Sequence, residues 1–216
     1  ARIEKLTRTM HPVSKKGAVI RPNGRLGVAT VQVRTAPVWD PQEKIYKLWD
    51  TAASPPDLYA AGKASSGYYE STDGLHWSQP ALGQIEYDPW PQNNYISLVA
   101  NGRHIRTDYV AYDPVDPDPS RRYKCALPPV GFAVSPDGRK WRMLDNVSGV
   151  PSGDEANFSF DVKARLFILT VKDGDTHGRA VSLATSKDFE NWTHHGLMFH
   201  ADKLDQELGR KNMEAR

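Results

Sequence analysis

Three copies of a short pattern, Ser, one residue, Asp, three residues and Trp, constrain the fold of this chain more than any other feature. They are STDGLHW (71–77), SPDGRKW (135–141) and SKDFENW (186–192). Ahead of each copy, an aromatic residue and Asp open a polar turn that leads through a basic residue into an apolar segment: VWDPQEKIYKLW (38–49), AYDPVDPDPSRRYKCAL (111–127) and SFDVKARLFILTV (159–171). Because the two patterns alternate in the same order three times, the chain consists of three repeated units.

The segments between these marks are short and rich in β-branched and aromatic residues, which is typical of strands. Each unit predicts four antiparallel strands, with an Asp-led turn after the first and the Ser-x-Asp turn before the last. A four-stranded sheet repeated every roughly 50 to 70 residues is typical of a β-propeller blade, since one such sheet cannot bury both of its faces alone. We therefore predict an all-β fold, a single partial β-propeller domain over residues 1–216. Its units lie at approximately 17–100, 101–150 and 151–200, and a short C-terminal helix lies in the tail 201–216.

The repeated residues have structural interpretations. We expect the tryptophans to be wedges between adjacent units, and Ser and Asp to fix the turns by accepting hydrogen bonds from nearby backbone amides. Cys125, in YKCAL, is expected in a buried strand. Three units are too few to close a propeller. The chain is therefore expected to be part of a longer protein or a homo-oligomer that covers the open blade faces.

Composition excludes several classes of protein. Lys and Arg number 28 against 26 Asp and Glu, and neither sign forms a long block, so no nucleic-acid or membrane partner is predicted. Cys125 is the only cysteine, so an intrachain disulfide is impossible. The first residues lack the apolar core of a signal peptide. The compartment stays open between the bacterial cytoplasm and, if a signal peptide was removed before residue 1, the periplasm or the exterior.

Several phrases carry a resemblance to a known group of proteins. They are KGAVIRPNG (16–24), VWDPQEKIYKLW, YYESTDGLHWSQPALGQIEY (68–87) with NN at 93–94, SRRYK (120–124), GDEANFSFD (153–161), GRAVSLATSKDFENW (178–192) and LMFHADKLDQELGR (197–210). From about residue 17 onward, the chain resembles the N-terminal part of bacterial five-bladed β-propeller proteins related to glycoside hydrolase families 32 and 43. The resemblance implies that about three of the five blades are present.

The resemblance also implies where chemistry would lie. Such glycosidases hold three carboxylates in an axial funnel, from the starts of the innermost strands of their first three blades. Asp108, in HIRTDYVAYD, and Glu155, in GDEANFSFD, match two of these positions. The first unit offers Arg34 and Thr35 in TVQVRTAP and no carboxylate. The implied function is a glycosidase-like hydrolase with Asp108 and Glu155 as acid and base. Asp154 is the nearest substitute carboxylate.

Further side chains complete the predicted site and leave two alternatives open. Arg34 and Arg106 would hold an anionic group of a small-molecule or carbohydrate substrate, and Asn157 would line the funnel. The alternative enzyme is a metal-dependent esterase or phosphoester hydrolase, with His104, His177 or His200 and the carboxylates binding zinc, manganese or calcium. The non-enzyme alternative is a carbohydrate-binding propeller unit in which Trp90 and Tyr95 contact a sugar.

Overall fold

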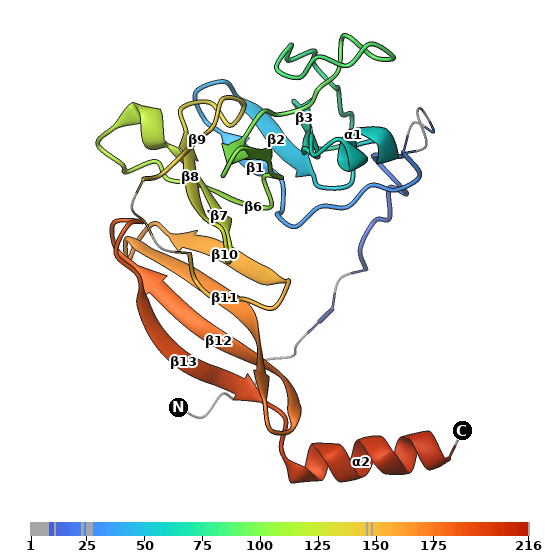
Figure 1. The fold of residues 1–216 in the computed structure, drawn as a ribbon, viewed down its shortest axis with the longest axis vertical. Coiled ribbons are helices and arrows are strands. Elements are labelled where there is room, and N and C mark those ends of the chain that lie inside the picture. The colour runs from blue at the N-terminus through green and yellow to red at the C-terminus, as the bar shows by residue number, and fades with distance from the viewer. Residues whose placement is uncertain are drawn as a thin grey trace.

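The structure is a computed structural model that describes residues 9–10, 12–22, 24, 28–145, 147 and 149–215. Three antiparallel sheets follow one another along the chain (Figure 1). In each sheet, consecutive strands are neighbours. The first sheet contains β1 (Val38–Asp40), β2 (Ile45–Asp50) and β3 (Gly67–Ser71). The second contains β6 (Tyr109–Tyr112), β7 (Tyr123–Leu127), β8 (Gly131–Ser135) and β9 (Arg142–Met143). The third contains β10 (Ala156–Asp161), β11 (Leu166–Asp175), β12 (Gly178–Ser186) and β13 (Thr193–His200).

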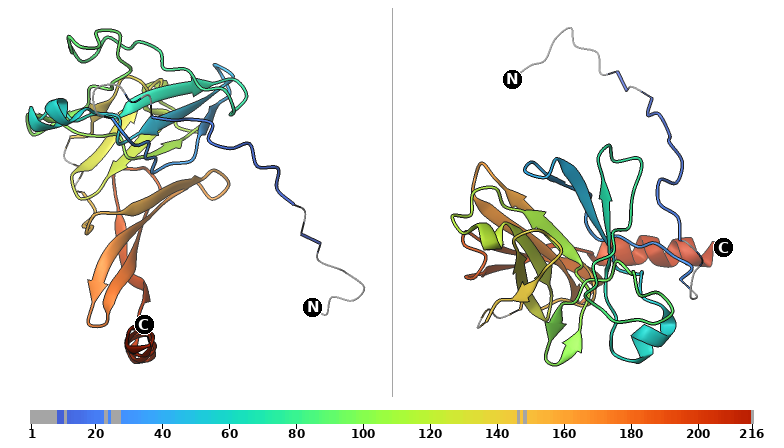
Figure 2. Two further views of the ribbon diagram at one scale, coloured as in Figure 1. Left: turned by 90° about the vertical axis from the view of Figure 1, so that its right-hand side faces the viewer. Right: turned by 90° about the horizontal axis from the view of Figure 1, so that it is seen from above.

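The remaining elements are short. They are the two-stranded pair β4 (Val99–Ala100) and β5 (Arg103–His104), the helices α1 (Pro56–Ala60) and α2 (Lys203–Glu214), and the 3₁₀ turn η2 (Pro119–Arg121). α2 is the predicted C-terminal helix. It buries no residue and, with the third sheet, extends away from the first two sheets (Figure 2, left). No helix in the described ranges is long and apolar enough to cross a membrane.

The three sheets are arranged around their first strands. β6 lies next to both β1 and β10. Thr35, just before β1, donates from Oγ1 to the Asp108 carbonyl at 3.2 Å and accepts the Val110 amide at 2.8 Å. The Ala156 amide at the start of β10 donates to the Tyr109 hydroxyl at 2.8 Å. This radial order, with first strands innermost, is the arrangement of successive β-propeller blades.

The first sheet departs from the predicted four strands. After the turn at 71–77 the chain pairs with β3 only through a bridge between Glu70 and Ser78, whose amides and carbonyls exchange hydrogen bonds of 3.0 and 2.8 Å. Pro80 follows two residues later and has no N–H with which to extend the ladder. α1, between β2 and β3, was not predicted, because five residues are too few to show helical periodicity.

The hydrophobic core has two main parts, each between adjacent sheets. Between the first and second sheets, Trp141 packs edge-on against the fully buried Trp49, with ring centroids 6.2 Å apart. Between the second and third sheets, Trp192 stacks on Phe132 at 4.7 Å. Two of the three repeat tryptophans are therefore wedges between sheets, as predicted. Trp77 belongs to none of the core clusters of described residues and donates to the Gly74 carbonyl of its own turn. Cys125 is fully buried in β7, also as predicted.

The three Ser-x-Asp turns are closed by the same hydrogen bonds. In the second turn, Ser135 Oγ accepts from the amides of Asp137 and Gly138 at 3.2 and 2.8 Å. Asp137 Oδ1 accepts from the amides of Arg139 and Lys140, both at 2.8 Å. The turns at 71–77 and 186–192 repeat this pattern. Ser and Asp are therefore the turn formers that the repeat predicted.

The residue after each turn Asp has a left-handed backbone. Gly74 and Gly138 have φ of +73°, and Phe189 has φ of +68°. A Cβ at Gly138 would lie 2.9 Å from the Trp49 ring, so glycine is required there for space as well as for conformation. Phe189 accepts the strained conformation and buries its ring completely between the second and third sheets.

We call the end of the sheets that carries the Asp-led and Ser-x-Asp turns the turn end. There, Lys47 is fully buried and donates to Asp40 Oδ2 at 2.7 Å, Glu43 Oε1 at 2.6 Å and the Asp137 carbonyl at 2.9 Å. Tyr123 of the second sheet also donates to Asp40, at 2.6 Å. Burial alone would raise the pKa of Asp40, but the hydrogen bonds from Lys47, Tyr123 and the backbone hold it well below its usual range. A buried, fully paired charge group thus joins the first two sheets.

Candidate active site

The opposite end, where the chain enters the first strand of each sheet, is here called the entry end, and it brings together three of the predicted site residues. Arg34 precedes β1, Asp108 precedes β6 and Glu155 precedes β10. Arg34 Nη1 donates to Glu155 Oε1 at 2.8 Å. Arg34 also lies close enough to Asp108 to lower the pKa of that carboxyl by its charge. Residues up to 121 positions apart therefore meet because β6 lies next to both β1 and β10.

Asp108 is the most buried of the predicted carboxylates. Its side chain is 25% exposed, and Oδ1 is buried without a hydrogen-bond partner among the described residues. Burial raises the pKa of Asp108, and the charges of Arg106 and Arg34 oppose that rise without cancelling it. Arg106 Nε lies 3.8 Å from Asp108 Oδ1, which is an ion pair without a hydrogen bond. Asp108 therefore keeps its proton to a higher pH than an ordinary Asp.

Glu155 differs from Asp108 in both exposure and pairing. Its side chain is 52% exposed and forms the ion pair with Arg34, whose side chain is 29% exposed. The hydrogen bond to Glu155 raises the pKa of Arg34. The two carboxyls thus lie in unlike environments, one desolvated and one ion-paired.

A hollow of about 510 Å³ opens beside Asp108. Four of the predicted residues line it, namely His104, Arg106, Asp108 and Asp154, together with Arg103 and residues of α1 and the β7–β8 turn. His104 Nδ1 is buried here without a partner among the described residues. Asp154 is exposed and pairs with Lys172 at 2.5 Å, a bond that lowers the pKa of Asp154. Asp154 is therefore a carboxylate whose charge is offset by Lys172.

A second hollow of about 230 Å³ adjoins Glu155 on the third sheet. Asn157 lines it, as do Thr170, Lys172 and Arg179. Asn157 pairs with Thr170 across β10 and β11, on the face of the sheet opposite to the core residue Phe158. The predicted funnel residue Asn157 thus lies beside Glu155 rather than in the hollow beside Asp108.

The three candidate metal-binding histidines do not gather at one site. His104 lines the hollow beside Asp108, whereas His177 lies at the β11–β12 turn and His200 at the end of β13. His200 Nδ1 is 2.9 Å from the Ala201 carbonyl and 3.3 Å from Asp175 Oδ2. Within the part of the chain that the structure describes, no group of three or more His, Cys, Asp or Glu side chains could hold a metal ion. Of the three histidines, His104 alone lines the hollow beside Asp108, and binding of zinc, manganese or calcium stays a prediction.

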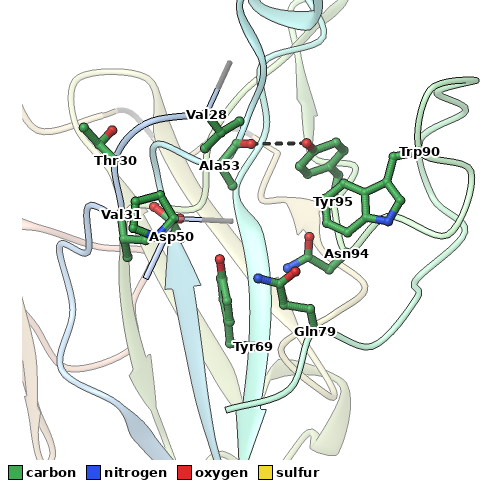
Figure 3. Close-up of a pocket in the computed structure, with 11 residues that line it drawn as sticks. Val28, Thr30, Val31, Asp50, Ala53, Tyr69, Gln79, Trp90, Asn94 and Tyr95 are labelled. Carbon is green, nitrogen blue, oxygen red and sulfur yellow. Dashed lines mark hydrogen bonds between the residues drawn. The ribbon is translucent and has the colours of Figure 1, made fainter. Parts of the chain in front are cut away.

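Trp90, one of the two aromatic residues predicted to contact a sugar, lies in the segment 72–98. It packs edge-on against Tyr95 at 5.5 Å, and Tyr95 is only 1% exposed, so Tyr95 cannot contact a sugar from solvent. Both residues line a small cavity with Asp50 and Tyr69 (Figure 3), where the Tyr95 hydroxyl donates to the Ala53 carbonyl. This cavity of about 20 Å³ is too small for a sugar. Tyr95 therefore belongs to a core cluster, whereas Trp90 is only partly buried against that cluster, and its contact with a sugar stays a prediction.

Sequence reasoning missed Tyr109. Its hydroxyl accepts the Ala156 amide, and its ring is buried between the second and third sheets. Burial raises the pKa of Tyr109, so its hydroxyl stays protonated beside Arg34 and Glu155. Strand alternation did not predict this role. Tyr109 directly follows Asp108, so the alternation places its ring on the opposite, core-facing side of the strand.

Comparisons with known proteins give distant structural likenesses. No family model matches the chain, and no curated protein matches it. The chain is similar to a glycosyl hydrolase from Bacteroides ovatus, with 14% identity over 86% of this chain and 58% of that one, and a TM-score of 0.49. It is also similar to an N-acetylgalactosamine deacetylase from F. plautii (15% identity, 77% and 52% covered, TM-score 0.47). A third structure, sucrose-6-phosphate hydrolase from Lactobacillus gasseri, has 12% identity, 74% and 33% covered, and a TM-score of 0.45.

The chain thus spans between 33% and 58% of the length of these three structures. Likeness at this level does not carry an activity from one protein to another. The function of this chain has to come from its own side chains.

Proposed function

We propose that this chain supplies the acid and base carboxylates of a glycosidase-related hydrolase, with Asp108 as general acid and Glu155 as general base. The observation that carries the proposal is that two carboxyls in unlike environments, both near Arg34, precede adjacent inner strands. Glycoside hydrolysis needs one carboxyl that keeps its proton and another that is ionised. Desolvation of Asp108 and ion pairing of Glu155 meet these two needs.

In this mechanism, Asp108 gives its proton to the oxygen of the leaving group as the glycosidic bond breaks. Glu155 removes a proton from the attacking water, whose oxygen bonds to the anomeric carbon. Arg34 holds the Glu155 carboxylate in place at 2.8 Å, and the Tyr109 hydroxyl fixes the start of β10. The hollow beside Asp108, of about 510 Å³, has room for the sugar.

We further propose, from the phrases that resemble them, that the chain belongs with the five-bladed propeller proteins related to families 32 and 43. The radial order of β1, β6 and β10 supports this placement. A further blade or a second copy would then cover the outer face of the third sheet.

The test is hydrolysis of a panel of aryl glycosides by the purified chain and by Asp108→Asn and Glu155→Gln. We expect each substitution to lower kcat by about 10²-fold or more, the usual contribution of a positioned acid or base. Glu86→Gln is the matched control, because Glu86 is an exposed carboxylate on the 72–98 segment. Urea unfolding of every variant separates lost chemistry from lost folding.

Two readouts are specific to a general acid. Asp108→Asn is expected to lose much less activity on 2,4-dinitrophenyl glycosides, whose leaving group needs no proton, than on phenyl glycosides. Wild-type activity on phenyl glycosides is expected to fall as pH rises through the raised pKa of Asp108, and this limb is expected to vanish in the variant. Equal losses on both substrates would contradict the assigned role. Sugar binding without turnover would instead favour a carbohydrate-binding unit.

A further inference from the structure

The side chains around the candidate site carry more positive than negative charge. The hollow beside Asp108 is lined by Asp108, Asp154, Arg103 and Arg106, and the hollow beside Glu155 is lined by Glu155, Lys172 and Arg179. Arg34 lines neither hollow but is bonded to Glu155. Five cations thus face three carboxylates. Burial also disfavours the charged form of Asp108, which increases the positive surplus.

Part of this positive charge is already used within the protein. Arg34 pairs with Glu155, and Lys172 pairs with Asp154. Arg106 differs, because its Nε lies 3.8 Å from Asp108 and its side chain is 45% exposed. A separation of 3.8 Å is too long for a hydrogen bond, and no other guanidinium N–H group of Arg106 donates to a described residue. Arg106 therefore presents a planar fork of donors to the hollow.

Unused polar atoms surround this fork. His104 Nδ1 and Asp108 Oδ1 are buried without partners among the described residues, and both side chains line the same hollow as Arg106. A buried polar atom without a partner is costly, and in native proteins a ligand or water commonly satisfies it. Sugar hydroxyls are suited to both atoms, since each hydroxyl can donate or accept.

We propose that the site takes an acidic sugar, with the anionic group of the sugar on Arg106 and its hydroxyls on His104 and Asp108. The carbohydrate part of this inference rests on the proposed function, whereas the anionic part rests on the charge surplus and the free Arg106 fork. A uronate carboxylate fits best, because guanidinium and carboxylate groups match in two parallel hydrogen bonds. A sulfate ester shares the same chemistry and forms a second arm of the test.

The experiment measures binding of D-glucuronate and D-galacturonate against D-glucose and D-galactose by calorimetry at low salt. We expect at least one uronate to bind about tenfold more tightly than its neutral counterpart, and the preference to weaken as salt rises. Arg106→Met is expected to remove the preference for the uronate over its neutral counterpart, and Arg106→Lys to restore part of it. Arg210→Met, on α2, is the matched control and is expected to keep the full preference.

The remaining arms separate the possible failures. Glucose 6-sulfate bound more tightly than glucuronate would support the anionic inference and identify a sulfated sugar. Inorganic sulfate bound as tightly as the uronate would overturn it, since the sugar would then contribute nothing. Hydrolysis of neutral aryl glycosides that depends on Asp108 and Glu155, without preference for aryl glucuronides, would overturn this inference and leave the proposed function intact. A preference for uronates without hydrolysis of any aryl glycoside would support the acidic-sugar inference and overturn the proposed function.

Discussion

Asp40 at the turn end accepts four hydrogen bonds, from Lys47, Tyr123 and two backbone amides, whereas Asp108 Oδ1 at the entry end has no partner among the described residues. Both carboxyls lie close to the ends of inner strands, and both are largely removed from water. Their pKa values shift in opposite directions, down for Asp40 and up for Asp108. The comparison teaches that burial alone does not mark a functional carboxyl in this fold. The absence of partners does.

The largest expected effect is at the turn end. Lys47→Met leaves Asp40 and Glu43 beside a buried apolar side chain, and breaking a buried ion pair in this way costs about 3 to 5 kcal/mol of unfolding free energy. Urea unfolding measures the loss. Lys172→Met is the matched control at the entry end, since its pair with Asp154 is exposed and contributes at most about 1 kcal/mol. Equal losses in the two variants would remove the contrast between the ends.

A second test applies one substitution to a tryptophan at each end. Trp141→Ala removes a wedge between the first two sheets and is expected to cost about 3 kcal/mol or more. Trp90→Ala is expected to cost about 1 to 2 kcal/mol, because Trp90 is only partly buried against Tyr95. The midpoint of urea unfolding gives both values. A larger loss for Trp90 would mean that the entry-end loop holds the sheets together.

The smallest effect is the most discriminating, because it has opposite signs. Asp40→Asn is expected to destabilise the fold by about 2 kcal/mol, since the hydrogen bond from charged Lys47 is lost. Asp108→Asn is expected to leave stability unchanged or raise it by up to about 1 kcal/mol at neutral pH, since it removes an unfavourable buried charge.

Measurements against pH check the sign of each effect. The pKa of Asp40 is lowered in the fold, so its contribution is present above the unfolded value of 3.8 and is lost as pH falls through the folded value. The pKa of Asp108 is raised, so ionising it opposes folding once pH exceeds 3.8. The stability gained by Asp108→Asn is therefore expected at neutral pH and should disappear below about 3.8. A gain that persists in acid would contradict a charge effect.

Much of the fold could be predicted from the repeats, because they fix local geometry. The Ser and Asp of each turn bond to each other and to amides two or three residues away, so their roles follow from spacing alone. The first sheet lacks its fourth strand because Pro80 follows Ser78. The repeat pattern did not predict this difference, because the other two units do form a fourth strand. The short helix α1 left no periodic signal.

The candidate site was predictable only in part. Asp108, Glu155 and Arg34 were located because each precedes the first strand of a unit, and the radial fold brings those starts together. Trp90, His177 and His200 lie elsewhere, since nothing in their spacing shows how a long loop folds or where a hairpin tip lies. The bonds that join the first two sheets, from Lys47 to the Asp137 carbonyl and from Arg139 to Glu43, likewise depend on contacts between residues far apart in sequence.

The contacts that the second Ser-x-Asp turn makes with the first sheet have a consequence for how these units can diverge. The Gly138 carbonyl accepts both Trp49 from the first sheet and Trp141 from its own turn, each at 2.9 Å, and the Asp137 carbonyl accepts Lys47. A backbone carbonyl survives every substitution that preserves the turn. Substitutions of Pro136 and Lys140 can therefore accumulate without breaking the hydrogen bonds between this turn and the first sheet. The same property would let an engineer transplant this turn between unrelated blades by copying only its Ser, Asp, Gly and Trp.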